Sequence, residues 1–396
     1  MNWVSGILLG LTVTGTLYYA LSALALVAFF RGKRITHAPA VRPRVSVLKP
    51  VCGVDRDAAS NFASYLGQDY ADYEVLFGAL EADDPAIEVI LDTIVGDKRA
   101  SLHIGTTIRG ANNKVRILHQ LAKHASGEIL VITDADTRVG PEFLSAVGAP
   151  FEDESVGVVT CLYRGVRAGG IADALEGLHM TCIFAPGVAC ARSLGGIDFG
   201  LGAAIAIRAK TLREIGGFEP IADYLADDFQ LGRRPARLGH RVELSRYVID
   251  EVLSAEGLRS ALARELRWSR TTRVSRPVGH AGLVFTFGFA YALMLLVALG
   301  LSPLGWAVLG CVLAIRLATA WIGARRLGDA QFARRAHLLP LRDLLSFGIW
   351  VAGFLGRTVA WRGRKLRVTK DGRMVRTSLE RKKKGADAEI GPHEIL

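Results

Sequence analysis

The chain of 396 residues is poor in cysteine and in charge. It has five cysteines with no Cys-x-x-Cys pair among them, and this irregular, odd set argues against a disulfide framework or a zinc site. Charged residues make up 22% and hydrophobic residues 50%, which excludes an intrinsically disordered chain. The mean hydropathy of +0.27 disfavours a wholly soluble protein. Long polar stretches in the middle exclude a channel that fills the whole length.

Acidic residues are the scarcer charge, with 38 Asp and Glu against 49 Lys and Arg. The excess lies near the C-terminal end, where 17 Lys and Arg but 4 Asp and Glu fall between Ala324 and Lys384. A basic end on a near-neutral body suggests an anionic surface nearby. Because apolar segments accompany it, we expect that surface to be the lipid bilayer, and we expect no nucleic acid partner.

The first apolar segment, residues 3–30, contains no charged residue. It exceeds the roughly 20 residues that cross a bilayer. No Lys or Arg precedes it, whereas Arg31, Lys33 and Arg34 follow it, the reverse of a cleavable signal peptide. We therefore predict an uncleaved anchor over residues 1–34, with its C-terminal flank in the cytoplasm.

Two further apolar segments, residues 281–301 and 306–322, are joined by a short uncharged link and flanked by basic residues. This pattern predicts a membrane hairpin whose tip faces away from the cytoplasm. Arg316, inside the second segment, is expected to face a neighbouring helix or to extend toward the interface. A fourth stretch, residues 344–359, has basic residues on both sides and fits either a span or a re-entrant or interfacial segment. We favour the second alternative, because it keeps the basic end in the cytoplasm. We thus expect membrane segments over residues 276–360 and a basic cytoplasmic tail over 361–396.

Residues 40–275 have an α/β pattern. Short apolar runs at 45–49, 73–78, 128–133 and 156–160 alternate with amphipathic segments such as 84–94 and 114–124. Such alternation predicts parallel strand–helix–strand units. Ligands in open sheets of this kind bind beyond the carboxyl ends of the strands, so polar residues that follow strands are the candidates for a site.

Two carboxylates, Asp134 and Asp136, follow the strand 128–133 directly. Oxygen ligands of this type bind Mg²⁺ or Mn²⁺, which would stabilise a departing nucleoside diphosphate. An exposed Asp-rich turn is the alternative. Asp84 follows the strand 73–78, where it would recognise a ribose hydroxyl or a base N–H, or simply cap the next helix.

Lys114 opens a helix after two asparagines, and a helix N-terminus with a lysine suits an anion. Asp227 and Asp228 form a third acidic site further along the chain. Adjacent carboxylates raise one another's pKa, and one of them could act as a general base. A helix cap is again the alternative.

The last candidate site is the run from Arg264 to Trp268. On a helical wheel, Arg264, Arg267 and Trp268 lie on one side and the neighbouring leucines on the other. Two guanidiniums suit a diphosphate, and an indole suits a platform for a sugar or an acceptor. A basic helix at the membrane interface is the alternative.

Taken in chain order, these motifs resemble glycosyltransferase family 2/21, and most of all its ceramide glucosyltransferase group. The resemblance begins at Leu48-Lys49-Pro50 and ends at Trp361-Arg-Gly-Arg364, and so covers roughly residues 1–370. It implies a GT-A fold, a Rossmann-like mixed sheet in a catalytic domain over residues 40–275, with transmembrane helices at both ends. It also implies a multi-pass protein of a bacterial inner membrane, with the catalytic domain in the cytoplasm.

The resemblance further implies roles for single residues. Asp84 would lie near uridine and Asp134 near the metal and diphosphate, Asp136 would bind metal, and Asp228 would be the base. Lys114, Asp227, Arg264, Arg267 and Trp268 would bind substrate. The family inverts the anomeric carbon, so we expect transfer of a hexose, with UDP-glucose favoured, from a UDP-sugar to the hydroxyl of a membrane lipid such as ceramide.

Three alternatives remain open at this point. Asp136, and a stretch 181–186 without histidine, are similar to the bacterial group that transfers N-acetylglucosamine from its UDP derivative to a hopanoid polyol. A processive polysaccharide synthase is disfavoured by Arg264 at a position where such enzymes usually carry Gln, and by the small number of apolar segments. A non-catalytic membrane scaffold is disfavoured by the intact set of three acidic sites.

Overall fold

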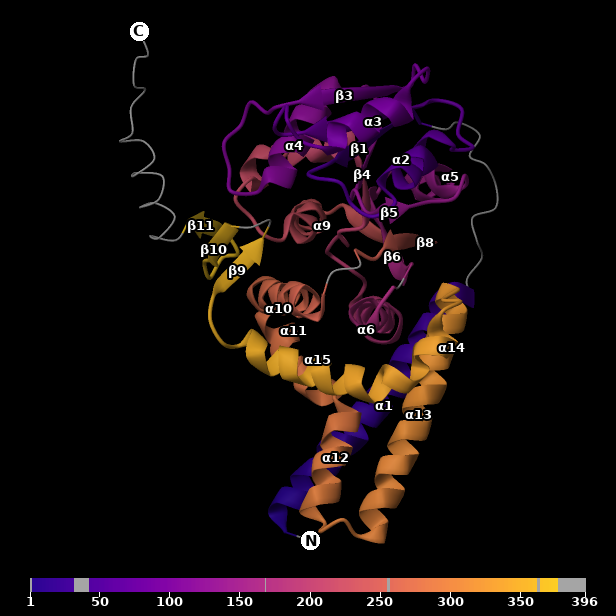
Figure 1. Cartoon of the computed structure of the whole chain (residues 1–396), viewed down its shortest axis with the longest axis vertical. Helices are drawn as coiled ribbons and strands as arrows, with labels where there is room; N and C mark the ends of the chain where they lie inside the picture. The colour runs from indigo at the N-terminus through magenta and orange to yellow at the C-terminus, as the bar shows by residue number, and fades with distance from the viewer. Residues whose placement is uncertain (1, 32–42, 168, 255–256, 362–363, 377–396) are drawn as a thin grey trace.

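An open sheet lies above a bundle of long apolar helices in the computed structural model of the chain, which describes residues 2–31, 43–167, 169–254, 257–361 and 364–376 (Figure 1). The sheet has eight strands in the order β3-β2-β1-β4-β7-β6-β8-β5. Their bounds are β1 Val45–Pro50, β2 Tyr73–Ala79, β3 Ala100–Ile104, β4 Ile129–Thr133, β5 Thr137–Arg138, β6 Val156–Val166, β7 Ala204–Arg208 and β8 Arg241–Val252.

The sheet is mixed. Strands β1, β2, β3 and β4 pair in parallel, as the strand–helix alternation predicts. β7 runs antiparallel between β4 and β6, β6 pairs in parallel with β8, and β5 closes the order antiparallel to β8. Every residue of β1 and β4 is buried, because helices cover both faces. The predicted GT-A-like class of mixed sheet is confirmed, and the predicted strands at 45–49, 73–78, 128–133 and 156–160 are present as β1, β2, β4 and β6.

Alternate side chains of the strands point to opposite faces of the sheet, and each face has its own hydrophobic core. One core joins the sheet to α4 and α9, and the other joins it to α2, α3 and α5. The helices of this domain are α2 Ala58–Leu66, α3 Ala86–Ile94, α4 Asn113–His124, α5 Phe143–Gly148, α8 Ala209–Glu214, α9 Asp227–Arg237 and α10 Leu258–Ser275, with short turns η1 Ala149–Glu152 and η3 Glu219–Ile221.

Three helices are long and apolar enough to cross a membrane within the described part of the chain. They are α1 (Trp3–Arg31), α13 (Pro303–Leu327) and the continuous helix Ile171–Gly195, which comprises α6 Ile171–His179, the π-helical η2 Met180–Phe184 and α7 Ala185–Gly195. Two-thirds of the best window of Ile171–Gly195 is buried inside the protein, against 39% for α1. Its apolar side chains therefore also belong to the protein core, and the sequence alone does not separate a membrane span from a core helix here.

Two consecutive apolar helices lie where the sequence predicts the membrane hairpin, and the first of them is broken. Helix α11 (Pro277–Gly282) and η4 (Leu283–Thr286) meet α12 (Gly288–Ala298) at an angle of 51°. The break lies where α12 meets α1: a Cβ on Gly15 would come within 2.3 Å of the Gly288 nitrogen. Phe289 N–H, left without a helical acceptor by the break, donates to the Tyr19 hydroxyl at 3.1 Å.

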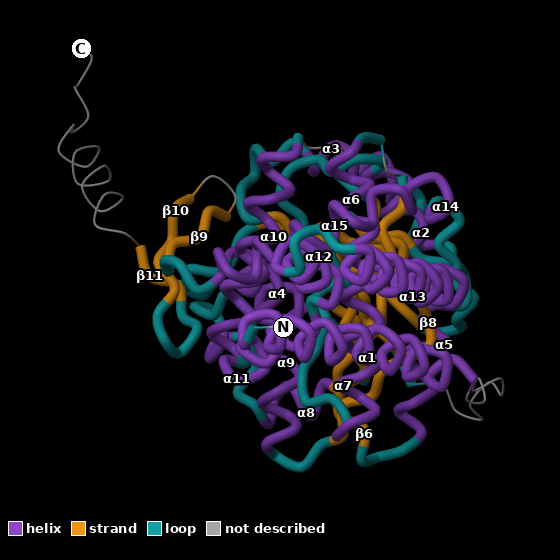
Figure 2. Tube along the Cα trace, turned by 90° about the horizontal axis from the view of Figure 1, so that it is seen from below, coloured by secondary structure: helices purple, strands orange, loops and turns teal. Residues whose placement is uncertain are grey.

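The C-terminal part of the chain, predicted as membrane segments followed by a tail, also contains a small sheet. After α14 (Phe332–Arg335) and η5 (Ala336–Leu338), α15 (Leu339–Gly353) runs across the ends of the apolar bundle (Figure 1). Strands β9 Thr358–Trp361, β10 Arg364–Val368 and β11 Met374–Arg376 then form a small sheet beside α10, seen from below in Figure 2. Residues 358–359 of the predicted interfacial stretch, and 361 and 364–376 of the predicted tail, are thus strand or turn. The rest of that tail, residues 362–363 and 377–396, lies outside the described residues.

Arg316 faces a neighbouring helix, one of the two arrangements that the sequence allows. Its guanidinium makes two hydrogen bonds of 2.8 Å to the Asp343 carboxylate on α15 and one of 3.1 Å to the Cys182 carbonyl. The guanidinium carbon lies 4.6 Å from the centre of the Tyr19 ring. Since Arg316 is 3% and Asp343 5% exposed, each charge depends on the other.

We predict that Asp343→Asn destabilises the protein by about 3–5 kcal/mol, because it leaves a buried guanidinium without its counter-charge. The double variant Arg316→Met/Asp343→Leu should lose much less. Denaturant unfolding in detergent measures both. Asp72→Asn is the control, since the Arg44–Asp72 pair is exposed and its loss should cost less than about 1 kcal/mol. Equal losses for Asp343→Asn and Asp72→Asn would contradict the prediction.

Candidate active site

The carboxyl end of β4 delivers Asp134 and Asp136 to one edge of the sheet. The whole of β4 is buried, whereas the Asp134 side chain is 38% exposed. Burial, and the nearby charges of Asp134 and Asp55, raise the pKa of Asp136 to about 7, although Lys49 opposes this. The ionised form of Asp136 is therefore disfavoured in the protein, and a cation bound nearby would favour it.

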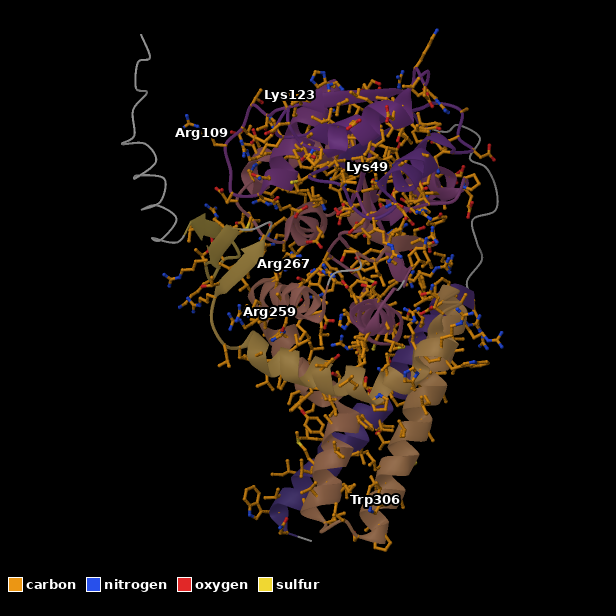
Figure 3. All side chains as sticks on the ribbon, viewed as in Figure 1. Lys49, Arg109, Lys123, Arg259, Arg267 and Trp306 are labelled. Carbon is orange, nitrogen blue, oxygen red and sulfur yellow. The ribbon has the colours of Figure 1, made fainter. Side chains whose placement is uncertain are left out.

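Lys49, in the part of the sheet labelled in Figure 3, holds this loop by hydrogen bonds. It is fully buried, and its Nζ donates to the Asp134 carbonyl at 2.7 Å and to Thr137 Oγ1 at 3.4 Å. The ammonium lies 3.9 Å from the centre of the Tyr65 ring. Burial lowers the pKa of Lys49 to about 7. A lysine inside an apolar strand is the sequence signal for this role.

Lys114 joins two acidic sites that lie far apart in sequence. Its Nζ is 2.6 Å from Asp134 Oδ1 and 3.5 Å from Asp227 Oδ2. Burial disfavours the ammonium, but the carboxylates of Asp134 and Asp227 outweigh it and raise the pKa of Lys114. Asn112 caps α4 by accepting from Val115 N–H, and its amide donates to Asp227 Oδ1 at 3.2 Å. The start of α4 and the start of α9 are therefore held together.

Asp228 lies beside this group. The point that a Cβ on Gly202 would occupy is 3.3 Å from Asp228 Oδ2 and 3.8 Å from Asp134 Oδ2, so both carboxylates face the same small space. Burial and the Asp227 carboxylate raise the pKa of Asp228 to about 6, against the attraction of Lys114. A carboxylate with a raised pKa is suited to accept a proton near neutral pH.

Helix α10 brings the cationic residues to the same space. Arg267 makes no hydrogen bond or ion pair with any residue that the structure describes. Burial and the neighbouring Arg264 charge lower its pKa, while Asp134 and Asp228 act in the opposite direction, which places the guanidinium within their field. Figure 3 shows Arg267 between α9 and α10.

Arg264 and Trp268 are engaged with the helix Ile171–Gly195. Arg264 donates to both carboxylate oxygens of Glu176, at 2.9 and 2.6 Å. The Trp268 ring lies against His179, with 6.3 Å between ring centres and 22° between planes. Arg264 is thus paired with protein rather than free for a ligand, and a histidine lies beside the tryptophan although residues 181–186 contain none.

Asp84 is placed apart from this group. Its carboxylate accepts from Gly53 N–H at 3.0 Å and from Ala86 N–H at 2.9 Å. It therefore caps α3, as the alternative interpretation expects, and also fixes the loop that follows β1. The structure shows no contact between Asp84 and the other acids.

Three further residues around the acids were missed from the sequence. Glu251 on β8 lies opposite Thr137, and burial together with the Asp136 charge raises its pKa well above the usual value. Tyr163 on β6 packs on Phe184 in a tilted arrangement, with ring centres 4.6 Å apart, and it lies within the field of Asp228 and Asp134. Glu176, on α6, is the third. Local sequence gives no signal for these positions, because strand pairing places Glu251 and Tyr163, and the packing of α6 places Glu176.

Donor chemistry and charge suit a divalent cation. Asp134 and Asp136 offer hard oxygen ligands, and one buried oxygen nearby, Asp227 Oδ2, has no hydrogen-bond partner. Among the described residues, no three acidic, His or Cys side chains form a metal cluster by themselves. Mg²⁺ and Mn²⁺ do not require a cluster of three protein ligands, because one or two carboxylates, together with diphosphate oxygens and waters, complete their coordination. The residues therefore fit such an ion.

The mixed sheet belongs to the GT-A-like fold class of solved glycosyltransferases. Of solved structures, the mannosyltransferase PcManGT from Pyrobaculum calidifontis, in complex with GDP-Man and Mn²⁺, shares the fold, with a TM-score of 0.56 and 18% identity over 89% of this chain and 99% of that one.

Sequence comparison defines the family. Residues 7–374 match the model of glycosyl transferase family 21, and the chain belongs to that family, as the resemblance implied. Ceramide glucosyltransferase 3 of Caenorhabditis elegans is 24% identical over 81% of this chain and 72% of that protein. Ceramide glucosyltransferase 1 of the same organism is 24% identical over 96% of this chain and 84% of that protein.

We predict that Lys49→Met raises the Mn²⁺ concentration needed for half-maximal UDP binding at least tenfold. The variant removes the donor that holds the Asp134 carbonyl, while methionine fills the same buried space, so the protein should still fold. Calorimetry with UDP over a Mn²⁺ series measures the effect, and the thermal midpoint reports folding. Exposed Lys98→Met is the control. An unchanged Mn²⁺ dependence in folded Lys49→Met would contradict this role.

Proposed function

We propose that the protein transfers a single hexose from a UDP-sugar, with UDP-glucose favoured, to a hydroxyl of a membrane lipid such as ceramide. One observation carries the proposal: Asp134, Asp227 and Asp228 converge around Lys114 and share their space with Arg267. Carboxylates for a metal and a base, facing a guanidinium for the diphosphate, are the groups that this reaction needs.

The choice of a lipid acceptor rests on the relatives and on the helices. The relatives named above are ceramide glucosyltransferases. Helices α1, α12 and α13 expose large apolar side chains, such as Leu17, Val297 and Trp306, which a bilayer would cover. Helix α10, which carries Arg267 and Trp268, packs on α15 at the junction between this bundle and the sheet (Figure 1).

In the proposed mechanism, Asp228 accepts the proton of the acceptor hydroxyl as the hydroxyl attacks the anomeric carbon opposite the departing UDP. The configuration at that carbon is then inverted. Arg267 stabilises the negative charge on UDP, and the Trp268 indole provides an apolar wall for the sugar or acceptor. Asp134 and Asp136 would hold Mg²⁺ or Mn²⁺, which supplies Lewis-acid stabilisation of the diphosphate. Asp84 is proposed to position the uridine side through the loop after β1.

One observation favours a second donor and acceptor. The acidic Asp136 and the lack of histidine in residues 181–186 are similar to bacterial enzymes that use UDP-N-acetylglucosamine and a hopanoid polyol. A bacterial inner membrane with the sheet domain in the cytoplasm suits either acceptor. Product analysis separates these candidates.

The direct test incubates the full chain, purified in detergent with Mn²⁺, with each of three donors and three acceptors. The donors are UDP-glucose, UDP-galactose and UDP-N-acetylglucosamine, and the acceptors are ceramide, diacylglycerol and a hopanoid polyol. Mass spectrometry should show ceramide that carries one glucose in β-linkage. Repeated additions would instead indicate a processive synthase, and no product with any pair would favour a scaffold.

We predict that Asp228→Asn abolishes transfer, with kcat reduced at least about 10³-fold, while UDP-sugar binding survives, because an amide cannot take the proton. Asp134→Ala is the matched contrast: it should weaken Mn²⁺-dependent UDP binding. Calorimetry and product assays on the same preparations separate the two effects. Near-normal turnover by Asp228→Asn would show that another group is the base.

The rate should also depend on pH through Asp228. Because the pKa of this carboxyl is raised to about 6, it is protonated, and inactive as a base, below that value. With Mn²⁺ and donor saturating, kcat should fall about tenfold per pH unit below about 6 and level off above it. A kcat that stays constant down to pH 5 would contradict the assignment.

A further inference from the structure

A cavity of about 450 Å³ lies at the C-terminal end of α15, between the end of α10 and the β10–β11 turn. Basic side chains gather around it: Arg273 from α10, Arg357 from the segment before β9, and Lys370 from the turn. No acidic side chain is among the described residues that line it. The cavity is therefore electropositive and suited to an anion.

The cations differ in how they are held. Arg273 donates to the carbonyls of Phe354 and Gly356, at 2.6 and 2.8 Å, which fixes it at the wall. Arg357 and Lys370 are exposed, and neither forms an ion pair with a described residue. The nearest acid of the turn, Asp371, is already bound to Arg373 at 3.2 Å. Two cations are thus free to meet a ligand.

Apolar side chains lie at the cavity and next to its lining in the chain. Phe354, which lines it, is 44% exposed. Val278 on α11, 85% exposed, follows the lining residue Pro277, and Leu355, 66% exposed, follows Phe354. Exposed apolar residues beside free cations match the boundary between lipid tails and head groups, where bases meet phosphate and apolar residues meet acyl chains. Figure 1 shows α15 at the level where the apolar bundle meets the sheet domain, which is the height expected for that boundary.

We propose that this cavity binds the phosphate of an anionic membrane phospholipid, with the acyl chains lying against Val278, Phe354 and Leu355. A soluble phosphate has the same charge but gains nothing from the apolar border. The site is separate from the acids and from Arg267, so this proposal does not depend on the proposed transfer reaction.

The experiment uses the full chain in detergent with equimolar phosphatidylglycerol and phosphatidylcholine, and native mass spectrometry counts the retained lipids. Wild type should retain phosphatidylglycerol at least tenfold over phosphatidylcholine. Arg357→Gln/Lys370→Gln should reduce this preference at least fivefold. The control Lys98→Gln/Arg213→Gln removes the same two charges from exposed positions elsewhere, and it should retain the wild-type preference.

Several outcomes would overturn the proposal. They are equal retention of the two lipids by wild type, an equal loss of preference in the control, and displacement of phosphatidylglycerol by inorganic phosphate at the same concentration, which would identify a soluble ligand. Sugar transfer by Arg357→Gln/Lys370→Gln, measured in detergent without phosphatidylglycerol, should stay within twofold of wild type. A larger loss would assign these residues to catalysis instead and would also overturn it.

Discussion

A set of buried ion pairs at the junction of the sheet and the apolar helices determines where helix α10 lies. On one side of α10, Arg264 pairs with Glu176 of the helix Ile171–Gly195. On the other side, Glu265 pairs with Arg342 of α15. The neighbouring residue of α15, Asp343, pairs with Arg316 and so joins α15 to α13. Such pairs add little net stability compared with apolar packing, but each strongly disfavours any arrangement that separates its charges. They therefore select one orientation of α10, and Arg267 and Trp268 take their positions from it.

The acidic residues at the end of β4 and the start of α9 also depend on compensation of buried charge. Asp134, Asp136 and Asp228 lie close together with much of their surface covered, which is unfavourable unless cations compensate. Lys114 and Lys49 supply part of that compensation, one at a carboxylate and one at a backbone carbonyl. Burial, and then the neighbouring carboxylates, still raise the pKa values of Asp136 and Asp228. A divalent ion bound there would favour the ionised form of these carboxyls.

The sequence predicted those parts of the fold that depend on local pattern. Apolar runs followed by acids identified β2 and β4, and the Asn112–Lys114 motif identified the start of α4. Contacts set by distant pairing were not predictable: nothing near Arg264 reveals Glu176, and Glu251 reaches the acids only because β8 pairs with β5 and β6. The break before Gly288 was equally hidden, since it arises from the approach of α1.

The helix Ile171–Gly195 links the two halves of the molecule. It has the length and hydropathy of a membrane span, yet most of its apolar surface packs on protein, including α1, α13 and β6. Its π-helical segment shifts the register of the side chains, so that His179 contacts Trp268 while Phe184 contacts Tyr163. Because one helix contacts α1 along α7, and contacts Arg264 and Trp268 along α6, a displacement of the bundle relative to the sheet would also move the groups that surround Arg264 and Trp268.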